Sequence, residues 1–420
     1  MIKILQVRNI DSFVESRRQK TSEKDKKIVQ AILNDVRKNG DSAVKKYEQK
    51  FNGRKTSQLR VSAKEIKEAR SKISREEVTA LRDMSARLLH RRKILAIAER
   101  VENRGSVYRY FVPIPSVGCY IPGGQARYPS SVVMSVVPAR KAGVKRIVVV
   151  SPPGRDGKID PLTIAAAKMC GATEIYKVGG AQAIAALAYG TKSIPKVDKI
   201  VGPGGKFVSI AKSFVSDQTA IDMVAGPTEL GIIADASSNP ELVALDLISQ
   251  AEHSKDTICF VITQSKTTAK QIQKSIEKLI PGTERSSIIK ESISKNGFIA
   301  VCKNQNEVIE LANKIAPEHM ELMVKNARSF SKKITGAGLL LIGKNTPSAA
   351  SDYLLGTNHI LPTSGFGRTR GGLSVLDFNK LQTIVESKKS TLREISKSLK
   401  TLTDAEGLPN HYKAVKRRLD

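Results

Sequence analysis

The chain reads RIVVVSPPGRDGKIDPLTIAAAKMCGATEIYKVGGAQAIAALAYGTKSIPKVDKIVGPGG from Arg146 to Gly205. Three short apolar runs, at 146–151, 174–178 and 199–201, alternate with alanine-rich stretches that favour helices. Strands that alternate with helices in this way indicate βαβ units and a mostly parallel sheet. Glycine turns follow the second and third runs, at the strand ends where such sheets bind ligands beside helix N-termini.

The same alternation extends in both directions from this stretch. We expect further strands at 107–112, 117–121, 230–234, 257–263, 298–302, 319–324 and 338–343. A helix is expected from Asn239 to about His253, and another at 267–279. Residues 1 to about 105 have a charged, helical pattern with two capping boxes, Ser62-x-x-Glu65 and Ser74-x-x-Glu77. The last forty residues are helical and basic. The predicted fold is α/β, with two Rossmann-like parallel-sheet domains and helical N-terminal and C-terminal segments.

Composition describes an ordinary globular chain of 420 residues, 40% hydrophobic and 26% charged. No segment approaches the roughly 20 apolar residues that span a bilayer. The N-terminus lacks the apolar core of a signal peptide, so we expect a cytoplasmic protein without a membrane partner.

The chain has four widely spaced cysteines and no C-x-x-C pair. They are Cys119, Cys170, Cys259 and Cys302. That pattern fits a reducing compartment and excludes a thiolate metal site.

The net charge of +30 is the unusual bulk property. A strongly basic chain is a candidate nucleic-acid binder. The basic residues are dispersed, however, aromatic residues make up only 5%, tryptophan is absent, and no recognition-helix, zinc-finger or RNP-like string occurs. We therefore expect a lysine-rich solvated surface rather than dedicated nucleic-acid binding, although the charge also favours capture of an anionic cofactor.

Four of the five histidines lie in short strings crowded with carboxylates and carboxamides. The strings are Gln250-Ala251-Glu252-His253, Pro317-Glu318-His319, Asp352-Tyr353 with Asn358-His359, and Glu406-Gly407 with His411. The fifth, His90, ends a charged helical stretch and is interpreted as structural or exposed. Because histidine titrates near neutral pH and is the commonest metal ligand, these strings predict a single chemical site.

Gln250 and His253 are three residues apart near the end of a predicted helix, which places both side chains on one face. They could chelate one ion, but the pair needs partners, and helices often carry this spacing without a metal. Asp352 and His411 are candidates, giving a nitrogen and oxygen ligand set without sulfur. Such a set suits Zn²⁺ or Mn²⁺ with positions left open for a substrate.

Glu318 and His319 lie at a predicted loop-to-strand junction, because Pro317 restricts Ala316 to extended geometry. Adjacent glutamate and histidine on such a loop suit a base and an acid that act on one substrate. The alternative is an ordinary solvated loop end.

Several of these strings resemble the histidinol dehydrogenase family. They are Ile221-Asp222-Met223-Val224-Ala225-Gly226-Pro227-Thr228-Glu229-Leu230, Gln250 to His253, Gly118 to Gly124, Val178 to Ala185, Ala316 to His319, Asp352 to Thr363, and Glu406-Gly407-Leu408-x-x-His411. The similarity runs from about residue 20 to the C-terminus. It implies a four-electron, NAD-dependent oxidation of L-histidinol to L-histidine through histidinal, in the last steps of histidine biosynthesis.

The resemblance also implies roles for individual residues. The family's zinc ligands, for one Zn²⁺ per subunit, correspond to Gln250, His253, Asp352 and His411. Its base and acid correspond to Glu318 and His319. Its substrate contacts correspond to Thr228, His319, His359 and Glu406, besides the metal ligands. Its NAD contacts correspond to Tyr120 and Gln182, and its third contact, an asparagine closing a G-P-G-N turn, is replaced here by Gly205. We therefore expect weakened or rearranged NAD contact at Gly205.

The same resemblance suggests the domain organisation and the assembly. Residues 1–20 form an N-terminal segment, residues 21–119 plus 230–380 a discontinuous main α/β domain, and residues 120–229 an incomplete Rossmann-like NAD-binding domain. Residues 381–420 form a helical tail that is swapped onto the partner subunit of a homodimer, so Glu406 and His411 would act across the interface. The sheet lacks a G-x-G-x-x-G fingerprint, so NAD would use the other glycine turns.

Two other enzymatic functions fit parts of the pattern. A zinc- and NAD-dependent relative could oxidise another amino-alcohol or a small diol, but His359 and Glu406 would recognise imidazole and amine. A metal hydrolase could use Zn²⁺ and Glu318 to activate water without a redox step. Tyr120 and Gln182 argue against the hydrolase, because it would need no dinucleotide contacts.

Overall fold

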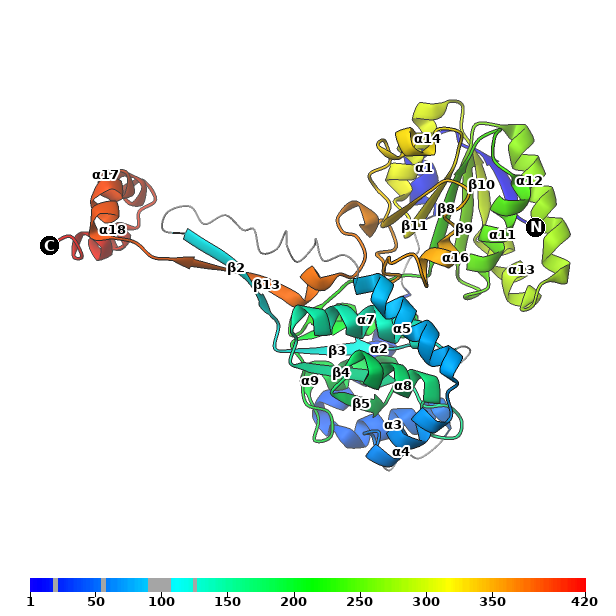
Figure 1. The fold of residues 1–420 in the computed structure, drawn as a ribbon. Helices are drawn as coiled ribbons and strands as arrows, with labels where there is room; N and C mark the ends of the chain where they lie inside the picture. Colours follow the sequence, from blue (N-terminus) through cyan, green and yellow to red (C-terminus); the bar gives the residue numbers. More distant parts are fainter. Residues whose placement is uncertain (18–21, 54–57, 90–106, 124–126) are drawn as a thin grey trace. The chain divides into compact units, whose positions relative to one another are not determined.

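The computed structural model describes residues 1–17, 22–53, 58–89, 107–123 and 127–420. His90, expected to be structural or exposed, and Gly124, the last residue of the Gly118–Gly124 string, lie outside these ranges. The chain divides into two compact units, one formed by Met1–Arg91 and Ile114–Phe378, the other by Arg92–Pro113 and Asn379–Asp420 (Figure 1). Within the described ranges, no helix is long and apolar enough to cross a membrane.

A six-stranded parallel sheet forms one part of the first unit. Its strands, in spatial order, are β1 (Lys3–Gln6), β10 (Phe298–Val301), β9 (Ile258–Thr263), β8 (Glu229–Ala234), β11 (His319–Met323) and β12 (Leu339–Ile342). Helices α11 (Pro240–Ala251), α12 (Lys266–Leu279) and α13 (Ser286–Lys295) share a core with one set of alternating strand residues, and α14 (Gln305–Ile315) and α15 (Ala327–Ser331) share a core with the other set. Both faces are covered, which is why these strands read as continuous apolar runs.

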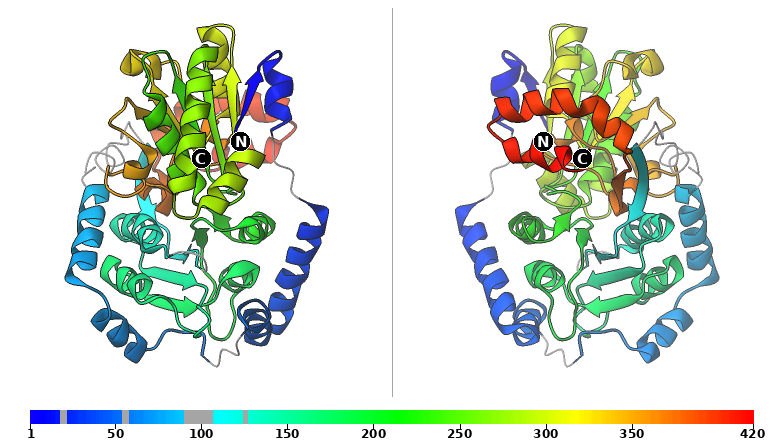
Figure 2. Two further views of the ribbon diagram at one scale, coloured as in Figure 1. Left: turned by 90° about the vertical axis from the view of Figure 1, so that its right-hand side faces the viewer. Right: turned by 90° about the vertical axis from the view of Figure 1, so that its left-hand side faces the viewer.

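A five-stranded parallel sheet forms the other part of the first unit. Its spatial order is β5 (Glu174–Lys177), β4 (Arg146–Ser151), β3 (Ser116–Tyr120), β6 (Lys199–Val201) and β7 (Ala220–Ile221). One core contains α7 (Pro129–Ala142) and α8 (Pro161–Cys170), and the other contains α9 (Gly180–Tyr189) and α10 (Lys206–Val215) (Figure 2). The strand order reverses between β3 and β6, where sheets of this kind bind ligands at their carboxyl ends.

The N-terminal helices belong with the five-stranded sheet. They are α2 (Glu23–Asn39), α3 (Asp41–Asn52), α4 (Ala63–Ser71) and α5 (Arg75–Leu89). Residues of α2 and α3 share the core of α9 and α10, and residues of α4 and α5 share the core of α7 and α8. This packing differs from the predicted grouping of residues 21–119 with 230–380. Hydrophobic periodicity predicts these helices, but it carries no information on which sheet they cover.

The second unit is built on a two-stranded antiparallel ribbon. Strand β2 (Val107–Pro113) pairs with β13 (Asn379–Val385), and the chain continues into α17 (Lys389–Ala405) and α18 (Pro409–Lys416) (Figure 1). Large apolar side chains on β13 and α17 are exposed in the single chain, among them Leu381, Ile384, Val385 and Leu402. Remaining short elements are α1 (Ile10–Glu15), α16 (Ser348–Ser351) and 3-10 turns at Ile280–Gly282, Phe366–Arg368 and Val375–Phe378.

The predicted α/β class with two parallel sheets is confirmed, and four local predictions are corrected. Ala316, which was expected to be extended before Pro317, is the left-handed C-cap of α14, with φ 51° and ψ 60°. Residues Lys3–Gln6 form a strand inside the segment predicted to be helical, and Asn379–Val385 form a strand that was not predicted. Helix α11 ends at Ala251 with Glu252 as its C-cap, so His253 lies beyond the helix. Both capping boxes are formed, since Ser62 bonds Glu65 and Ser74 bonds Glu77 reciprocally.

Candidate functional site

Asp352 lies at the centre of the predicted site, directly after α16. Its carboxylate Oδ1 is 3.1 Å from His319 Nε2, and its backbone carbonyl is 2.8 Å from His359 Nδ1. A carbonyl only accepts, so His359 Nδ1 carries hydrogen and its Nε2 accepts from the Ser131 hydroxyl at 3.2 Å. Ser131 belongs to α7, and no pattern in its sequence neighbourhood marks it.

His319 begins β11 and is buried, with 1% exposure. Its Nε2 donates to the Asp352 carboxylate, so Nδ1 of the neutral ring is a hydrogen-bond acceptor. Within the described residues Nδ1 has no hydrogen-bond partner, and it lies 3.9 Å from Glu318 Oε2. Burial lowers the pKa of His319, but the hydrogen bond to Asp352 and the charge of Glu318 outweigh it and raise the pKa. Among the described residues Nδ1 is therefore available to a ligand, as an acceptor when the ring is neutral and as a donor in the imidazolium that the raised pKa favours.

Glu318 is held by a second buried glutamate, Glu229, at the start of β8. The Glu229 backbone N–H donates to Glu318 Oε2 at 2.9 Å, and the Glu318 backbone N–H donates to Glu229 Oε2 at 3.2 Å. Burial raises the pKa of Glu318 to about 8 and that of Glu229 to about 7. A carboxylate poised near neutral pH is an effective general base. Glu229 stands in the quoted motif, but nothing in its spacing distinguishes it.

Gln250 is buried, and its side-chain amide can offer an oxygen to a cation if the amide oxygen and nitrogen exchange places. Its Oε1 lies 3.4 Å from the Ser348 hydroxyl, whereas Nε2 has no partner among the described residues. Amide oxygen and nitrogen are assigned from the network, so they can be exchanged. Nε2 would then donate to Ser348, leaving a buried amide oxygen free. That oxygen, together with Asp352, is the kind of donor that suits Zn²⁺.

His253 lies just past α11, linked by its backbone N–H to the Gln250 carbonyl at 3.2 Å. The side chain is open to solvent, although neighbouring protein atoms desolvate it enough to lower its pKa against the raising effect of Asp352. His253 is therefore joined to Gln250 by the final backbone turn of the helix, and the two residues do not share one face of a continuous helix.

The remaining predicted substrate contacts and metal ligands do not form a cluster with the residues above among the described contacts. Thr228 is half-buried directly before β8. Glu406 and His411 belong to the second unit, where both are exposed. Across the described residues, no three His, Cys, Asp or Glu side chains gather into a ready metal site. Of the four predicted zinc ligands, Gln250 is not one of these residue types, and His411 belongs to the second unit. The first unit therefore supplies only His253 and Asp352 to such a group.

The predicted NAD contacts lie along the carboxyl edge of the five-stranded sheet. Tyr120 ends β3, and its hydroxyl accepts from the Gly180 N–H at 3.1 Å, two residues before Gln182 in the first turn of α9. Gly202 packs on Tyr120 so closely that a Cβ would lie 2.2 Å from the Tyr120 carbonyl oxygen. Gly205 is the N-cap of α10, and nothing lies within 4 Å of the position its Cβ would take.

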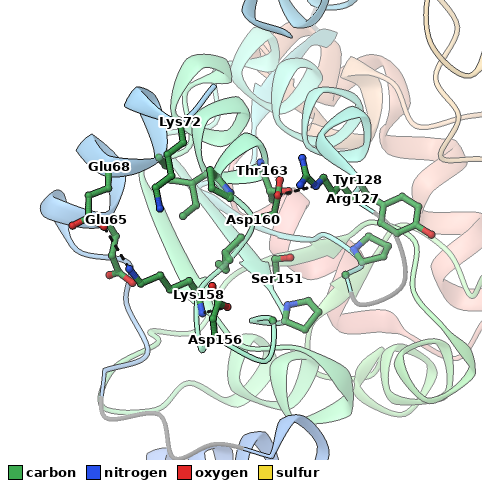
Figure 3. Close-up of a pocket in the computed structure, with 18 residues that line it drawn as sticks. Glu65, Glu68, Lys72, Arg127, Tyr128, Ser151, Asp156, Lys158, Asp160 and Thr163 are labelled. Atoms are coloured by element: carbon green, nitrogen blue, oxygen red, sulfur yellow. Dashed lines mark hydrogen bonds and ion pairs between the residues drawn. The ribbon is translucent and has the colours of Figure 1, made fainter. Parts of the chain in front are cut away.

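A separate cavity of about 510 Å³ opens at the carboxyl end of β4 (Figure 3). Its charged side chains largely pair with one another: Arg127 lies 3.2 Å from Asp160 and Lys158 lies 3.5 Å from Glu68. Asp160 also caps α8 by accepting from two backbone N–H groups. The helix N-terminus at this cavity is therefore already satisfied by a carboxylate.

Comparison with known proteins identifies the family. The model of the family described as histidinol dehydrogenase matches residues 15–419. The chain is 42% identical to the histidinol dehydrogenase of Bacillus cereus, over 93% of this chain and 92% of the relative, and 43% identical to that of Methanocaldococcus jannaschii, with the same coverage. The crystal structure of histidinol dehydrogenase from Elizabethkingia anophelis superimposes with a TM-score of 0.91 and 33% identity, covering 100% of this chain and 98% of that one.

The chain belongs to the histidinol dehydrogenase family. As a member it is an oxidoreductase of histidine biosynthesis with histidinol dehydrogenase activity. Histidinol dehydrogenases generally depend on NAD and zinc.

Proposed function

We propose that this histidinol dehydrogenase oxidises L-histidinol to L-histidine in two NAD-dependent steps, with zinc holding the substrate. The observation that carries the proposal is the buried His319 ring, which Asp352 holds through Nε2 and whose Nδ1, beside Glu318, has no hydrogen-bond partner in the part of the chain that the structure describes. A fixed base next to a carboxylate is what successive alcohol and aldehyde oxidations require.

Gln250, His253, Asp352 and His411 would hold the metal. When bound, Zn²⁺ supplies a Lewis acid that anchors the substrate's imidazole and amine. Asp352 has a second task in this arrangement, because the same carboxylate orients His319 at 3.1 Å. Coupling the base to a metal ligand fixes the base relative to the anchored substrate, and such orientation can contribute on the order of 7–11 kcal/mol to the rate.

His319 would serve the first oxidation, with Nδ1 of the neutral ring taking the proton of the alcohol hydroxyl. Glu318 would serve the second oxidation by removing a proton from the water that adds to the aldehyde. NAD, when bound, would supply the hydride acceptor for both oxidations, one NAD for each. All four cysteines are buried, and burial raises the pKa of Cys170 and Cys302 to about 12. A thiolate route is therefore disfavoured.

Recognition of histidinol is assigned to Thr228, His359 and Glu406, besides the metal ligands. His359 is held at both ring nitrogens, by the Asp352 carbonyl and the Ser131 hydroxyl. Its role would require either replacement of Ser131 by substrate or contact through the ring face. Gly205, Gln182 and Tyr120 are assigned to NAD, with the loss of the family's asparagine at Gly205 weakening that contact.

We also propose that the enzyme is a cytoplasmic homodimer in which Glu406 and His411 complete the partner's site. Support comes from the apolar side chains that β13 and α17 expose in the single chain, including Leu381, Val385 and Leu402. Burial of such side chains is the usual driving force for association.

The test is the amount of NADH formed per L-histidinol consumed by the purified full-length protein with Zn²⁺ and excess NAD. A ratio near two that a chelator abolishes supports both the two-step oxidation and the metal. A ratio of one would contradict the second step. Turnover that survives complete metal removal, checked by elemental analysis, would contradict the role of zinc.

A further inference from the structure

Glu48 is a fully buried carboxylate on α3 that lies at the N-terminus of α9. Its Oε1 accepts two hydrogen bonds, from the Gly179 backbone N–H at 2.9 Å and from Gln182 Nε2 at 2.8 Å. The residue is 131 positions from Gly179 in sequence, and no motif marks it. A carboxylate thus occupies the helix end that would otherwise attract an anionic part of the cofactor.

These two bonds determine the orientation of the Gln182 amide. The Gly179 N–H can only donate, so the atom facing it must be an acceptor, which is Glu48 Oε1. An acceptor in that position requires Gln182 to present its nitrogen rather than its oxygen. The remaining atom, Gln182 Oε1, then points away from Glu48, buried and without a partner among the described residues. The usual ambiguity of an amide assignment does not arise here.

Tyr120 supplies a hydrogen-bond donor beside the next residue, Gly180. Its hydroxyl oxygen accepts from the Gly180 N–H at 3.1 Å, so its hydrogen stays available for donation. Burial raises the pKa of Tyr120 to about 12, with Glu48 contributing, so the phenol keeps that hydrogen at neutral pH. Gln182 Oε1 also lies against Gly180, where a Cβ would approach it to 2.7 Å. A fixed acceptor and a fixed donor therefore flank one glycine.

We infer that Glu48 is a positioning residue that makes this edge of the sheet select a cofactor group with a hydrogen-bond donor beside an acceptor. The inference rests on the proposed assignment of Tyr120 and Gln182 to NAD. Two parts of NAD carry such a pattern, the amino edge of adenine and the carboxamide of nicotinamide. Hypoxanthine reverses the pattern of adenine, and an acetyl group removes the donor of the carboxamide. A site with fixed polarity rejects these analogues because its buried groups are left unpaired.

The experiment measures dissociation constants by calorimetry on the full-length protein, for NAD, nicotinamide hypoxanthine dinucleotide and 3-acetylpyridine adenine dinucleotide. The variants are Glu48→Met, which removes the acceptor, and Glu48→Gln, whose amide oxygen can still accept from Gly179 and Gln182. We expect the wild type to bind one analogue roughly ten- to hundredfold more weakly than NAD, since an unpaired buried group costs about 1–3 kcal/mol. Glu48→Met should bring that ratio close to one, and Glu48→Gln should retain it.

A ratio of affinities is the decisive readout, because general damage to the fold lowers the affinity for NAD and its analogues together. The inference is overturned if the wild type binds NAD but discriminates against neither analogue, or if Glu48→Met discriminates as strongly as the wild type. Failure of the wild type to bind NAD at all would instead overturn the proposed function on which the inference rests. Circular dichroism of each variant checks that the fold is retained.

Discussion

At the scale of single residues, the site depends on atoms whose hydrogen-bonding roles are forced by their neighbours. The Asp352 carbonyl fixes the tautomer of His359, and the Asp352 carboxylate fixes that of His319. Glu318 is fixed in turn by the backbone of Glu229. His319 and Glu318, the two groups proposed to react, are thus held by Asp352 and Glu229, which have no proposed proton-transfer role. Such support keeps the positions of the two groups constant between the two oxidations.

Replacement of Glu318 separates the two oxidations. Glu318→Gln keeps the size of the side chain but removes the base, so oxidation of L-histidinal should fall by roughly 10²–10⁴-fold while oxidation of L-histidinol falls less. Single-turnover measurements with each substrate give the two rates. Equal losses in both steps would contradict the assignment of water activation to Glu318.

Gly205 offers a second test at this scale. Its φ of −65° suits any residue, and the space beyond its Cα is open, so Gly205→Asn should be accommodated without strain. The new amide restores the polar group that the family carries there. NAD should bind about fivefold more tightly, as expected for one hydrogen bond of about 1 kcal/mol. Gly205→Ala is the control without a polar atom, and equal NAD affinities for the Ala and Asn variants would argue against the contact.

At the scale of elements, the turns at the carboxyl edge of the five-stranded sheet are held by buried charges. Lys212 on α10 donates to the Gly202 carbonyl at 3.0 Å and forms an ion pair with Asp222, and both side chains are almost completely buried. Asp222 accepts from the Gly202 N–H at 2.8 Å. The pair ties the β6–α10 turn to the loop that leads to Thr228. One ion pair thus connects the sheet edge proposed to bind NAD with the segment proposed to bind the substrate.

Breaking this pair should destabilise the five-stranded sheet strongly. Lys212→Met leaves Asp222 buried without its cation, which typically costs about 3–5 kcal/mol. Lys206→Met on the same helix is the matched control, because its pair with Asp25 leaves the lysine 60% exposed and such pairs contribute about 0–1 kcal/mol. Hydrogen exchange of amides in β3 to β6 measures both. Similar losses of protection in the two variants would contradict a specific role for the buried pair.

At the scale of the whole molecule, the predicted site is divided between the two compact units. Gln250, His253 and Asp352 belong to the first unit, and Glu406 and His411 belong to the second. If the second unit serves a partner subunit, each active site contains residues of two chains.

Mixing two variants that are both deficient in L-histidinal oxidation tests this arrangement. His411→Ala removes the proposed metal ligand from the second unit, and Glu318→Gln removes the proposed base from the first. Heterodimers would contain one intact site, so L-histidinal oxidation should recover to at most about half of the wild-type activity for each heterodimer. Native mass spectrometry establishes how many heterodimers form. Their formation without recovery of activity would place each site within one chain.

Most of the architecture could be predicted from the sequence, because buried parallel strands and glycine turns have strong local patterns. The pairing of Glu318 with His319 could also be predicted, since the two residues are adjacent in the chain. Ser131 and Glu48 were missed for one reason: each reaches the site from a helix far away in sequence, and its local pattern is that of an ordinary helix residue. Strand β1 was missed because four residues are too few for a periodic signal.

That first strand has a consequence for synthesis. Lys3 pairs with Phe298, so the edge of the six-stranded sheet joins residues that are 298 − 3 = 295 positions apart in the chain. A ribosome adding about 5–20 residues per second needs roughly 15–60 seconds to make the partner of β1 after β1 itself. The five-stranded sheet draws its strands only from residues 116–221 and is complete earlier. We therefore expect the nascent chain to fold from its middle outward, with its first residues among the last to be incorporated.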